Sequence, residues 1–191
     1  TPVDVAEFER EANRILAEVE QECGWMYETQ HVDANGKPIL DSDGKSVIGK
    51  INYVVWSDVF ICPNCMKEVV FWDAAVDKDE GKVYDEFPCP HCKTLLTKRS
   101  MSRAWITYFD SALNENIKQA KQTPVIINYS NKITKGRCEK RPDDVDLKLL
   151  ENILQIPVPP NAPIARMMKG QETRRNDPAG ITHIHHFYTQ R

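Results

Sequence analysis

Two Cys-Pro-x-Cys motifs constrain the fold of this chain more than any other feature. Cys62 and Cys65 form the first pair, Cys89 and Cys92 form the second, and 23 residues separate the pairs. Each motif places two thiolates on one tight turn, and two such turns complete the tetrahedral shell of a structural zinc ion. The separation slightly exceeds the usual spacing, but it fits a strand, a turn and a second strand. We therefore predict one structural zinc ion bound by these four cysteines.

The sequence leaves three other uses of these cysteines open: a thioredoxin-type redox pair, two disulfides, and free thiols. A redox centre needs one such pair at the start of a helix, and disulfides need an oxidising compartment. Zinc fits the pattern better than either. Cys23 and Cys138 stand apart from the motifs. We expect a reducing, cytoplasmic setting in which a metal holds the four thiolates.

The composition is typical of a soluble globular protein with one domain, or one domain and a smaller satellite. The chain has 191 residues, of which 41% are hydrophobic and 28% charged, enough to bury a core without covalent support. No apolar run approaches the roughly 20 residues that span a bilayer. The first residues contain neither a basic leader nor an apolar stretch, so no signal peptide is expected. The missing initiator Met indicates a segment cut from a longer protein.

The residue pattern predicts an α+β fold with an N-terminal helix, a β-rich zinc ribbon, a mixed strand and helix region, and an extended Pro-rich tail. A helix is expected over residues 5–22, where apolar residues recur at helical spacing after the N-cap residue Asp4. Gly24 should end it. A second helix is expected from Pro142 to about residue 155. The expected strands cover residues 25–29, 51–61, 67–76, 83–87, 103–109 and 124–129, and a basic strand within 132–141.

Turn signals complete this outline and divide the chain into four segments. Residues 1–50 hold the first helix, a short strand and a polar hairpin at 31–49. Residues 51–97 form the zinc ribbon, with each cysteine pair at the end of a strand. Residues 98–156 form a basic α/β region, in which 111–122 is expected to be a short helix or a loop. Residues 157–191 form a basic tail, which begins with four prolines in seven residues and so cannot continue the helix.

Charge is distributed unevenly along the chain. Residues 1–92 carry 8 Lys and Arg against 19 Asp and Glu, whereas residues 93–191 carry 17 against 9. Clustered positive charge is the electrostatic footprint of nucleic-acid binding. The C-terminal half is therefore predicted to face a polyanion. The alternative is ordinary variation in surface composition.

No catalytic motif is present. The eight glycines form neither G-x-G-x-x-G nor a Walker phosphate loop, and no Ser/His/Asp or Cys/His grouping surrounds a nucleophile. Pro159-Pro160 lacks the flanking residues of the Asp/Asn-Pro-Pro-aromatic motif of amino-methyltransferases. His183, His185 and His186 are closely spaced, but such histidines lie in a surface strand more often than they bind a metal. By itself the chain is not expected to be an enzyme.

Several segments together resemble a family of prokaryotic site-specific DNA methyltransferases of the adenine-N6/cytosine-N4 type, as found in restriction-modification systems. They are the paired Cys-Pro-x-Cys motifs, Thr1-Pro2-Val3-Asp4, Glu22-Cys23-Gly24-Trp25-Met26-Tyr27-Glu28-Thr29, Gly170-Gln171-Glu172-Thr173-Arg174-Arg175-Asn176-Asp177 and Gly180-Ile181-Thr182-His183-Ile184-His185-His186-Phe187-Tyr188-Thr189-Gln190-Arg191. The resemblance covers nearly the whole chain and is weakest over residues 31–49 and 110–122.

The resemblance implies a non-catalytic target-recognition domain inserted in the catalytic domain of a longer polypeptide. S-adenosylmethionine would bind only in the parent enzyme, and no cofactor-binding or catalytic residue is carried over to this chain. The partners implied are double-stranded DNA and the catalytic domain of the same polypeptide. The alternative is a protein-interaction module that the zinc stabilises and that does not contact DNA.

A recognition domain holds DNA through phosphate contacts from Lys and Arg and reads sequence through base edges. The residues predicted to contact DNA are Lys98, Arg99, Arg103, Lys132, Lys135, Arg137, Lys140, Arg141, Arg174 and Arg175. The alternative is that these side chains form a solvated face or pair with acidic residues of the N-terminal half. The aromatic residues expected in the core, rather than stacked on bases, are Trp105, Tyr108, Phe109 and Tyr129.

Overall fold

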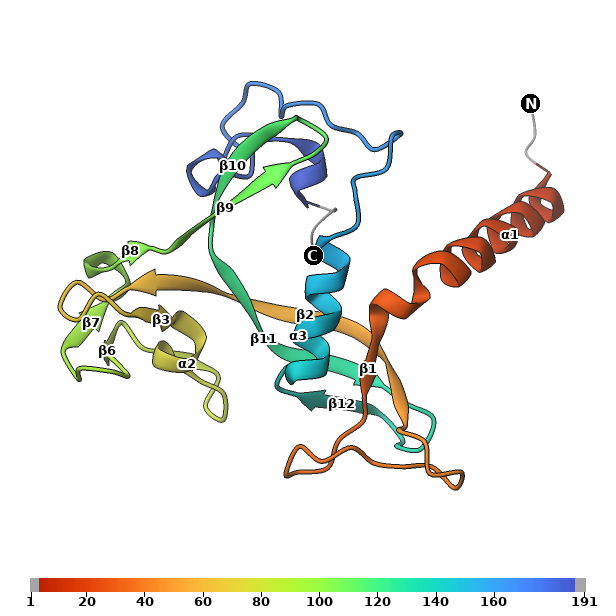
Figure 1. The fold of residues 1–191 in the computed structure, drawn as a ribbon, viewed down its shortest axis with the longest axis horizontal. Coiled ribbons are helices and arrows are strands. Elements are labelled where there is room, and N and C mark those ends of the chain that lie inside the picture. Colours follow the sequence, from red (N-terminus) through yellow and green to blue (C-terminus); the bar gives the residue numbers. More distant parts are fainter. Residues whose placement is uncertain (1–3, 188–191) are drawn as a thin grey trace. The chain divides into compact units, whose positions relative to one another are not determined.

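The computed structural model describes residues 4–187, which form an α+β fold with antiparallel sheets (Figure 1). Two compact units share the chain. Unit 1 comprises Thr1–Val54 and Ile126–Leu150, and unit 2 comprises Val55–Val125 and Glu151–Arg191. Part of the resemblance falls on residues 1–3 and 188–191, which lie outside the described residues. The four segments expected from the sequence stay a prediction.

Unit 1 begins with α1 (Val5–Cys23), which confirms the helix predicted over 5–22. The Asp4 carboxylate accepts hydrogen bonds from the amides of Ala6 and Glu7 at 3.0 and 3.2 Å, as an N-cap residue should. The predicted strand over 25–29 is partly wrong, because Gly24–Tyr27 form a 3₁₀ turn (η1) and β1 covers only Glu28–Gln30. Gly24 keeps a right-handed helical conformation instead of a left-handed cap, so the chain continues to coil past it.

An antiparallel sheet supplies the core of unit 1 through residues 48–54 of β2 (Ile48–Ile61) and 126–130 of β11 (Gln122–Ser130), whose remaining residues belong to unit 2. The strand order is β1, β2, β11 and β12 (Arg137–Lys140), which confirms the strands predicted at 51–61 and 124–129. Tyr129 is buried, and a Cβ atom at Gly49 would lie 2.4 Å from its ring, so only glycine fits there. The predicted second helix is α3 (Asp144–Leu154).

The polar segment before β2 contains two matched turns in place of a single hairpin. Asp33 Oδ1 accepts from the amides of Asn35 and Lys37, and eight residues later Asp41 Oδ1 accepts from those of Asp43 and Lys45, all at 2.8–2.9 Å. These bonds are Asx turns, in which a short acidic side chain replaces a backbone acceptor. The eight-residue repeat behind them went undetected in the sequence.

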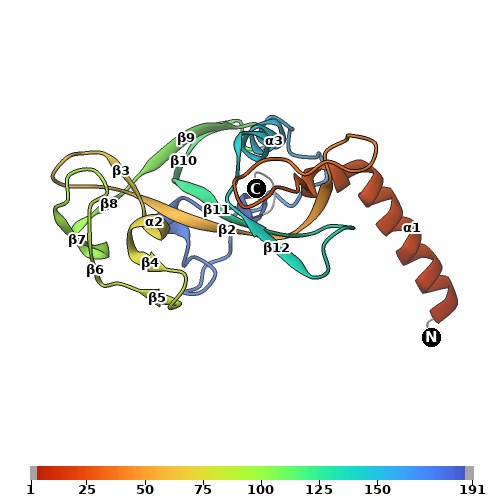
Figure 2. The same ribbon diagram turned by 90° about the horizontal axis from the view of Figure 1, so that it is seen from below.

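The cysteine-bearing part of unit 2 is built from short antiparallel pairs attached to the end of β2 (Figure 2). Its elements are β3 (Glu68–Val70), α2 (Phe71–Ala75), β4 (Val76–Asp77), β5 (Lys82–Val83), β6 (Glu86–Pro88), β7 (Leu95–Thr97), η2 (Lys98–Ser100) and β8 (Ser102–Arg103). The continuous strand predicted over 67–76 is wrong in its middle. The Trp72 amide donates to the Ser57 hydroxyl at 3.0 Å, and the chain turns into α2 there. The strand predicted over 83–87 is likewise split into β5 and β6.

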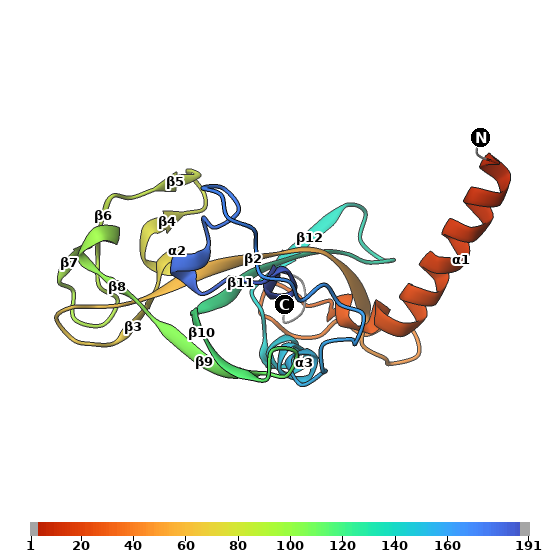
Figure 3. The same ribbon diagram turned by 90° about the horizontal axis from the view of Figure 1, so that it is seen from above.

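A second hairpin in unit 2 pairs β9 (Trp105–Asp110) with β10 (Glu115–Ala120) over six residues (Figures 1 and 3). The short helix or loop predicted over 111–122 is therefore wrong. Asp110 Oδ1 accepts from the amides of Ala112 and Leu113, and Asn114 adopts a left-handed φ of 55°. Both features close a tight turn that returns the chain as a strand.

The tail consists of turns and short 3₁₀ helices over residues 157–187, so the extended course expected for it is not shown. η3 covers Asp177–Ala179 and η4 covers Ile184–Phe187. The surface strand expected for the histidines is wrong, because His185 and His186 lie in η4 and are buried. Within residues 4–187, no helix is both long and apolar enough to span a membrane.

Candidate metal centre

The two cysteine motifs fold into the same backbone shape. In the first, the Met66 amide donates to the Cys62 carbonyl and the Cys62 amide donates to the Lys67 carbonyl, both at 3.0 Å. In the second, Lys93 donates to Cys89 at 3.0 Å and Cys89 donates to Thr94 at 2.8 Å. The residue after each second cysteine has a left-handed φ, 59° and 63°. Each motif therefore aims two sulfur atoms to one side of its turn.

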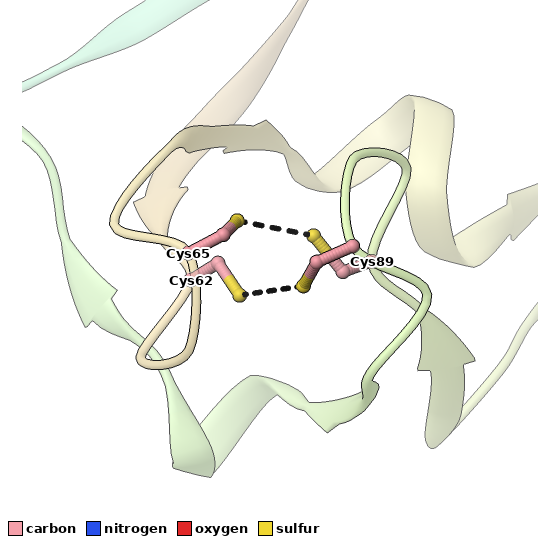
Figure 4. Close-up of side chains that lie close together, drawn as sticks. Cys62, Cys65 and Cys89 are labelled. Carbon is pink, nitrogen blue, oxygen red and sulfur yellow. Dashed lines mark hydrogen bonds between the residues drawn. The ribbon is translucent and has the colours of Figure 1, made fainter.

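The four sulfur atoms meet at one point in unit 2 (Figure 4). Cys62 Sγ lies 3.8 Å from Cys92 Sγ, and Cys65 Sγ lies 3.8 Å from Cys89 Sγ. With a zinc–sulfur bond of about 2.3 Å, the edge of a tetrahedron is about 3.8 Å. The spacing is far longer than a disulfide bond of about 2.05 Å. The predicted cluster is thus confirmed: the four cysteines lie close together, could hold a metal ion, and are compatible with zinc.

The protonation of Cys65 and Cys92 also favours a cation. Hydrogen bonds from Asn64 and Thr94 lower the pKa of Cys92 to about 5. The Lys67 amide acts to lower the pKa of Cys65, but burial and the three neighbouring thiols together raise it to about 11. Thiolates this close repel one another, so the last proton is held tightly. A divalent cation removes that repulsion and converts all four to ligands.

The cysteines are part of the hydrophobic core of unit 2. Cys62 and Cys89 are buried, and they pack in one cluster with Phe60, Val69, Ala75, Phe87, Leu96 and Met101. His91 lies inside the second motif, but its Nε2 donates to the Glu68 carbonyl at 3.0 Å. That bond joins the second motif to β3. A metal at this position would link the two halves of the core and leave no coordination position for a substrate.

The basic residues predicted to contact DNA fall in both units. In unit 1, Lys132 and Lys135 lie on the exposed turn between β11 and β12, and Arg137 starts β12, an outer strand of the sheet. Within residues 4–187 none of these three forms an ion pair. Arg141 is exposed just after β12. The turn therefore presents three uncompensated positive charges to solvent.

Lys140 does not belong with them. Its side chain is only 4% exposed, and its ammonium contacts Asp143 at 2.6 Å and Asp146 at 2.8 Å. Asp146 also accepts from the Thr29 hydroxyl at 2.6 Å. The ammonium is directed into unit 1, where it joins β12 to the start of α3. A phosphate contact would require this buried cluster to break, since a carboxylate left without its partner is costly.

In unit 2 the basic residues are partly engaged with neighbours. Lys98 is exposed and lies over the Phe71 ring at 4.8 Å, and Arg103 contacts Asp58 at 3.3 Å. Arg175 pairs with Glu172 at 3.4 Å. The remaining two are Arg99, which is exposed, and Arg174, which is half-buried. Exposed ion pairs are weak, so Arg175 can exchange Glu172 for a phosphate.

A buried polar cluster that the sequence did not predict lies elsewhere in unit 2. His185 and His186 each donate from Nε2 to Asp110 Oδ2, at 2.8 and 3.1 Å. Together with two backbone amides, four donors converge on the Asp110 carboxylate. All three side chains are buried. The closely spaced histidines were the only sequence signal, because their acidic partner lies 75 residues earlier.

Asp110, His185 and His186 lie close enough to hold a metal ion, but the hydrogen bonds of His186 favour a structural network. His186 Nδ1 accepts from the Thr182 amide at 3.2 Å, so the proton of the neutral ring is on Nε2, which faces Asp110. A metal-bound histidine normally donates from its second ring nitrogen. The two histidines therefore join η4 to Asp110 at the end of β9.

This network predicts a loss of stability at mildly acidic pH. Burial lowers the pKa of His183 and of His186 below the usual histidine value. Below about pH 6.5 the unfolded chain binds protons that the folded chain rejects, so stability should fall from pH 7 toward the depressed folded-state pKa. Burial alone would raise the pKa of Asp110, but bonds from the histidines lower it. The contribution of the Asp110 carboxylate to the free energy of unfolding is therefore lost only at still lower pH.

Urea unfolding at pH 7.5, 6.5 and 5.5 checks this prediction, with His186→Gln as the comparison because glutamine can still donate to Asp110. Zinc release also depends on pH, but it affects both proteins equally. The difference between their free energies of unfolding at each pH therefore reports the contribution of His186. Equal pH dependence in both proteins would contradict the assignment.

The aromatic residues expected in the core separate into two groups. Tyr129 is buried in unit 1, as predicted, and its hydroxyl lies 2.8 Å from His31 Nδ1. Tyr108 is half-buried in unit 2. Trp105 and Phe109 are 41% and 58% exposed, so a core position for these two is wrong. They lie on a hairpin that the sequence did not predict.

Comparison with protein-family models, with curated proteins and with solved structures gives no match. What the chain does must therefore be inferred from its own residues.

Proposed function

We propose that this chain is a zinc-stabilised DNA-recognition domain of an S-adenosylmethionine-dependent amino-methyltransferase, non-catalytic by itself. Three uncompensated cations on the β11–β12 turn, Lys132, Lys135 and Arg137, carry the proposal. The tail and the cysteine motifs resemble that enzyme family, and this resemblance is the reason for proposing that the domain belongs to such an enzyme. Double-stranded DNA and the catalytic domain of the same polypeptide are the proposed partners, and the setting is cytoplasmic. The cofactor would bind in that catalytic domain.

Zinc has a structural role in this proposal. Four thiolates at tetrahedral spacing close the coordination shell. The metal then fixes the core from which Lys98, Arg99 and Arg103 project. DNA contact comes from these residues, from Arg141, Arg174 and Arg175, and from the β11–β12 turn. Lys140 is left out of the set because its ammonium is already paired inside unit 1.

Salt-dependent DNA binding tests the proposal. About six phosphate contacts should give a log–log slope of affinity against salt near −5. Lys132→Ala/Lys135→Ala should remove two contacts and reduce the slope to about −3.6. The matched control is Lys37→Ala/Lys45→Ala, which deletes the same charge from exposed turns of the same unit. Fluorescence anisotropy with a labelled duplex gives both slopes. Affinity that does not change with salt would refute the DNA-recognition function.

A second candidate is a protein-interaction module without DNA contact, and α1 favours it. None of the helix's 19 residues is buried, although its apolar residues recur at helical spacing. In proteins, most of the stability of a helix comes from packing its apolar face against other elements, and α1 lacks such packing among the described residues. Absence of duplex binding at low salt, together with a zinc-loaded folded protein, would favour this candidate.

A further inference from the structure

The β9–β10 hairpin has one open face and one face that is partly covered, on which Ile106 stays 42% exposed. Side chains alternate between the two faces along each strand, and directly paired residues share a face. The register pairs Thr107 with Lys118 and Phe109 with Asn116. The open face therefore comprises Trp105, Thr107, Phe109, Asn116, Lys118 and Ala120. All but Ala120 are exposed.

The other face is held by the tail of unit 2. Asp110 receives the two histidine bonds on this side. A Cβ atom at Gly180 would lie 2.1 Å from the Lys118 carbonyl oxygen, so the tail backbone touches β10 directly. Two-stranded hairpins alone are marginally stable, and this backing fixes the hairpin. The open face is thus a preformed surface.

The open face combines aromatic rings with a positive charge and no carboxylate. Lys118 Nζ lies 5.1 Å from the Trp105 ring centroid. The hairpin's acidic residues, Asp110 and Glu115, lie opposite each other in the strand register, on the other face of the hairpin. Thr107 and Asn116 add hydrogen-bonding groups between the rings. The core of a protein–protein interface is depleted of charged residues, whereas here the Lys118 ammonium lies beside the Trp105 ring.

We propose that this face binds unpaired nucleotides of DNA, with one base stacked on Trp105, another on Phe109, and a phosphate beside Lys118. The proposal rests on the proposed function for the identity of the polyanion as DNA. Aromatic rings along a positive surface are the general means of holding single strands. The rings lie four residues apart on one strand, about 13 Å, or about four stacked base steps. The bases held are therefore not adjacent.

Unpaired nucleotides occur where an amino-methyltransferase acts. Such an enzyme must extrude its target base from the duplex, which leaves neighbouring stacking broken and the opposite base unpaired. A rigid face with two exposed rings could stack against exposed bases and stabilise the opened duplex. Duplex phosphates would be held by the basic residues named above.

The test compares binding of a labelled ten-thymidine strand and of a labelled duplex by the full chain. Trp105→Ala/Phe109→Ala should weaken strand binding at least tenfold, because each stacked base contributes about fivefold to more than 100-fold. Duplex binding should change less than twofold. Lys118→Gln should reduce the salt slope for the strand by about 0.7.

A closely matched control is Trp25→Ala/Tyr27→Ala, since these rings are 40% and 55% exposed against 41% and 58% for Trp105 and Phe109. This control should bind the strand like the wild type. Trp105→Leu/Phe109→Leu keeps apolar side chains on the strand and guards against loss of the hairpin fold. It should bind the strand as weakly as the alanine variant while unfolding at the wild-type temperature.

Three outcomes would overturn the proposal: no binding of the ten-thymidine strand, equal binding by the ring variants and the wild type, or equal loss in the Trp25/Tyr27 control. Strand binding that depends on the rings, without any duplex binding, would support this site while refuting the duplex-recognition function. Salt-dependent duplex binding, together with strand binding that the ring substitutions leave unchanged, would support the duplex-recognition function and refute this site.

Discussion

Removal of zinc should unfold the cysteine-bearing core of unit 2. Structural zinc contributes about 10–16 kcal/mol of apparent binding free energy in small zinc domains, which is as large as the roughly 5–15 kcal/mol that stabilises a typical protein. Without the metal, the four sulfur atoms, which all lie within 4.8 Å of one another, lose the ion that offsets their mutual repulsion. Phe87 and Leu96 come from short strands on either side of the second motif, so they lose their fixed position.

Hydrogen exchange before and after chelation measures this effect at chosen amides. Cys62, Met66, Cys89 and Lys93 donate the backbone bonds that shape the two motifs, and their protection should disappear. Cys89→Ser should give the same result without a chelator. Cys23→Ser is the control, because Cys23 ends α1 in unit 1, outside the cluster. Less than about half an equivalent of zinc in fresh protein, or amides that stay protected, would contradict the assignment.

Asp110→Ala should be the most damaging single substitution outside the metal centre. The Asp110 carboxylate accepts two histidine and two backbone hydrogen bonds and is buried. Bonds to a charged acceptor contribute about 1.5–3 kcal/mol each, and buried donors left without an acceptor add a desolvation cost. We expect a loss of about 3–5 kcal/mol in the free energy of unfolding. The hairpin and the tail should separate together.

Asp77→Ala provides the matched control for this substitution. Asp77 Oδ1 also accepts from two backbone amides, Asp79 and Glu80, and its Oδ2 accepts from the Tyr84 hydroxyl at 3.1 Å, but it has no histidine partner. The difference between the two variants in urea unfolding therefore reports the two buried histidine bonds against one bond from a tyrosine. A similar small loss in both variants would contradict the structural role given to His185 and His186.

The fold shows where local sequence patterns suffice. The spacing of apolar residues and the N-cap Asp4 define α1, because a helix makes its hydrogen bonds within four residues. The two cysteine motifs predict the metal cluster for the same reason, since each ligand pair lies on its own turn. Two predictions from local patterns failed. Gly24 keeps a right-handed conformation and leads into η1 instead of forming a left-handed helix cap. At Trp72, a hydrogen bond to the Ser57 hydroxyl accompanies the turn into α2 in place of the predicted strand.

By itself, then, the sequence determined the N-terminal helix, the long strands and the four clustered cysteines, all of which depend on contacts near in sequence. Only the tertiary structure decided which charges and rings reach solvent. In the sequence, Lys140 is one more cation of a basic strand; in the structure, its ammonium is buried against Asp146. Trp105 and Phe109 read as core residues until β10 pairs with β9 and the tail covers the opposite face. Burial depends on residues far away in the sequence, and no local spacing records which distant side chain will fill a given position.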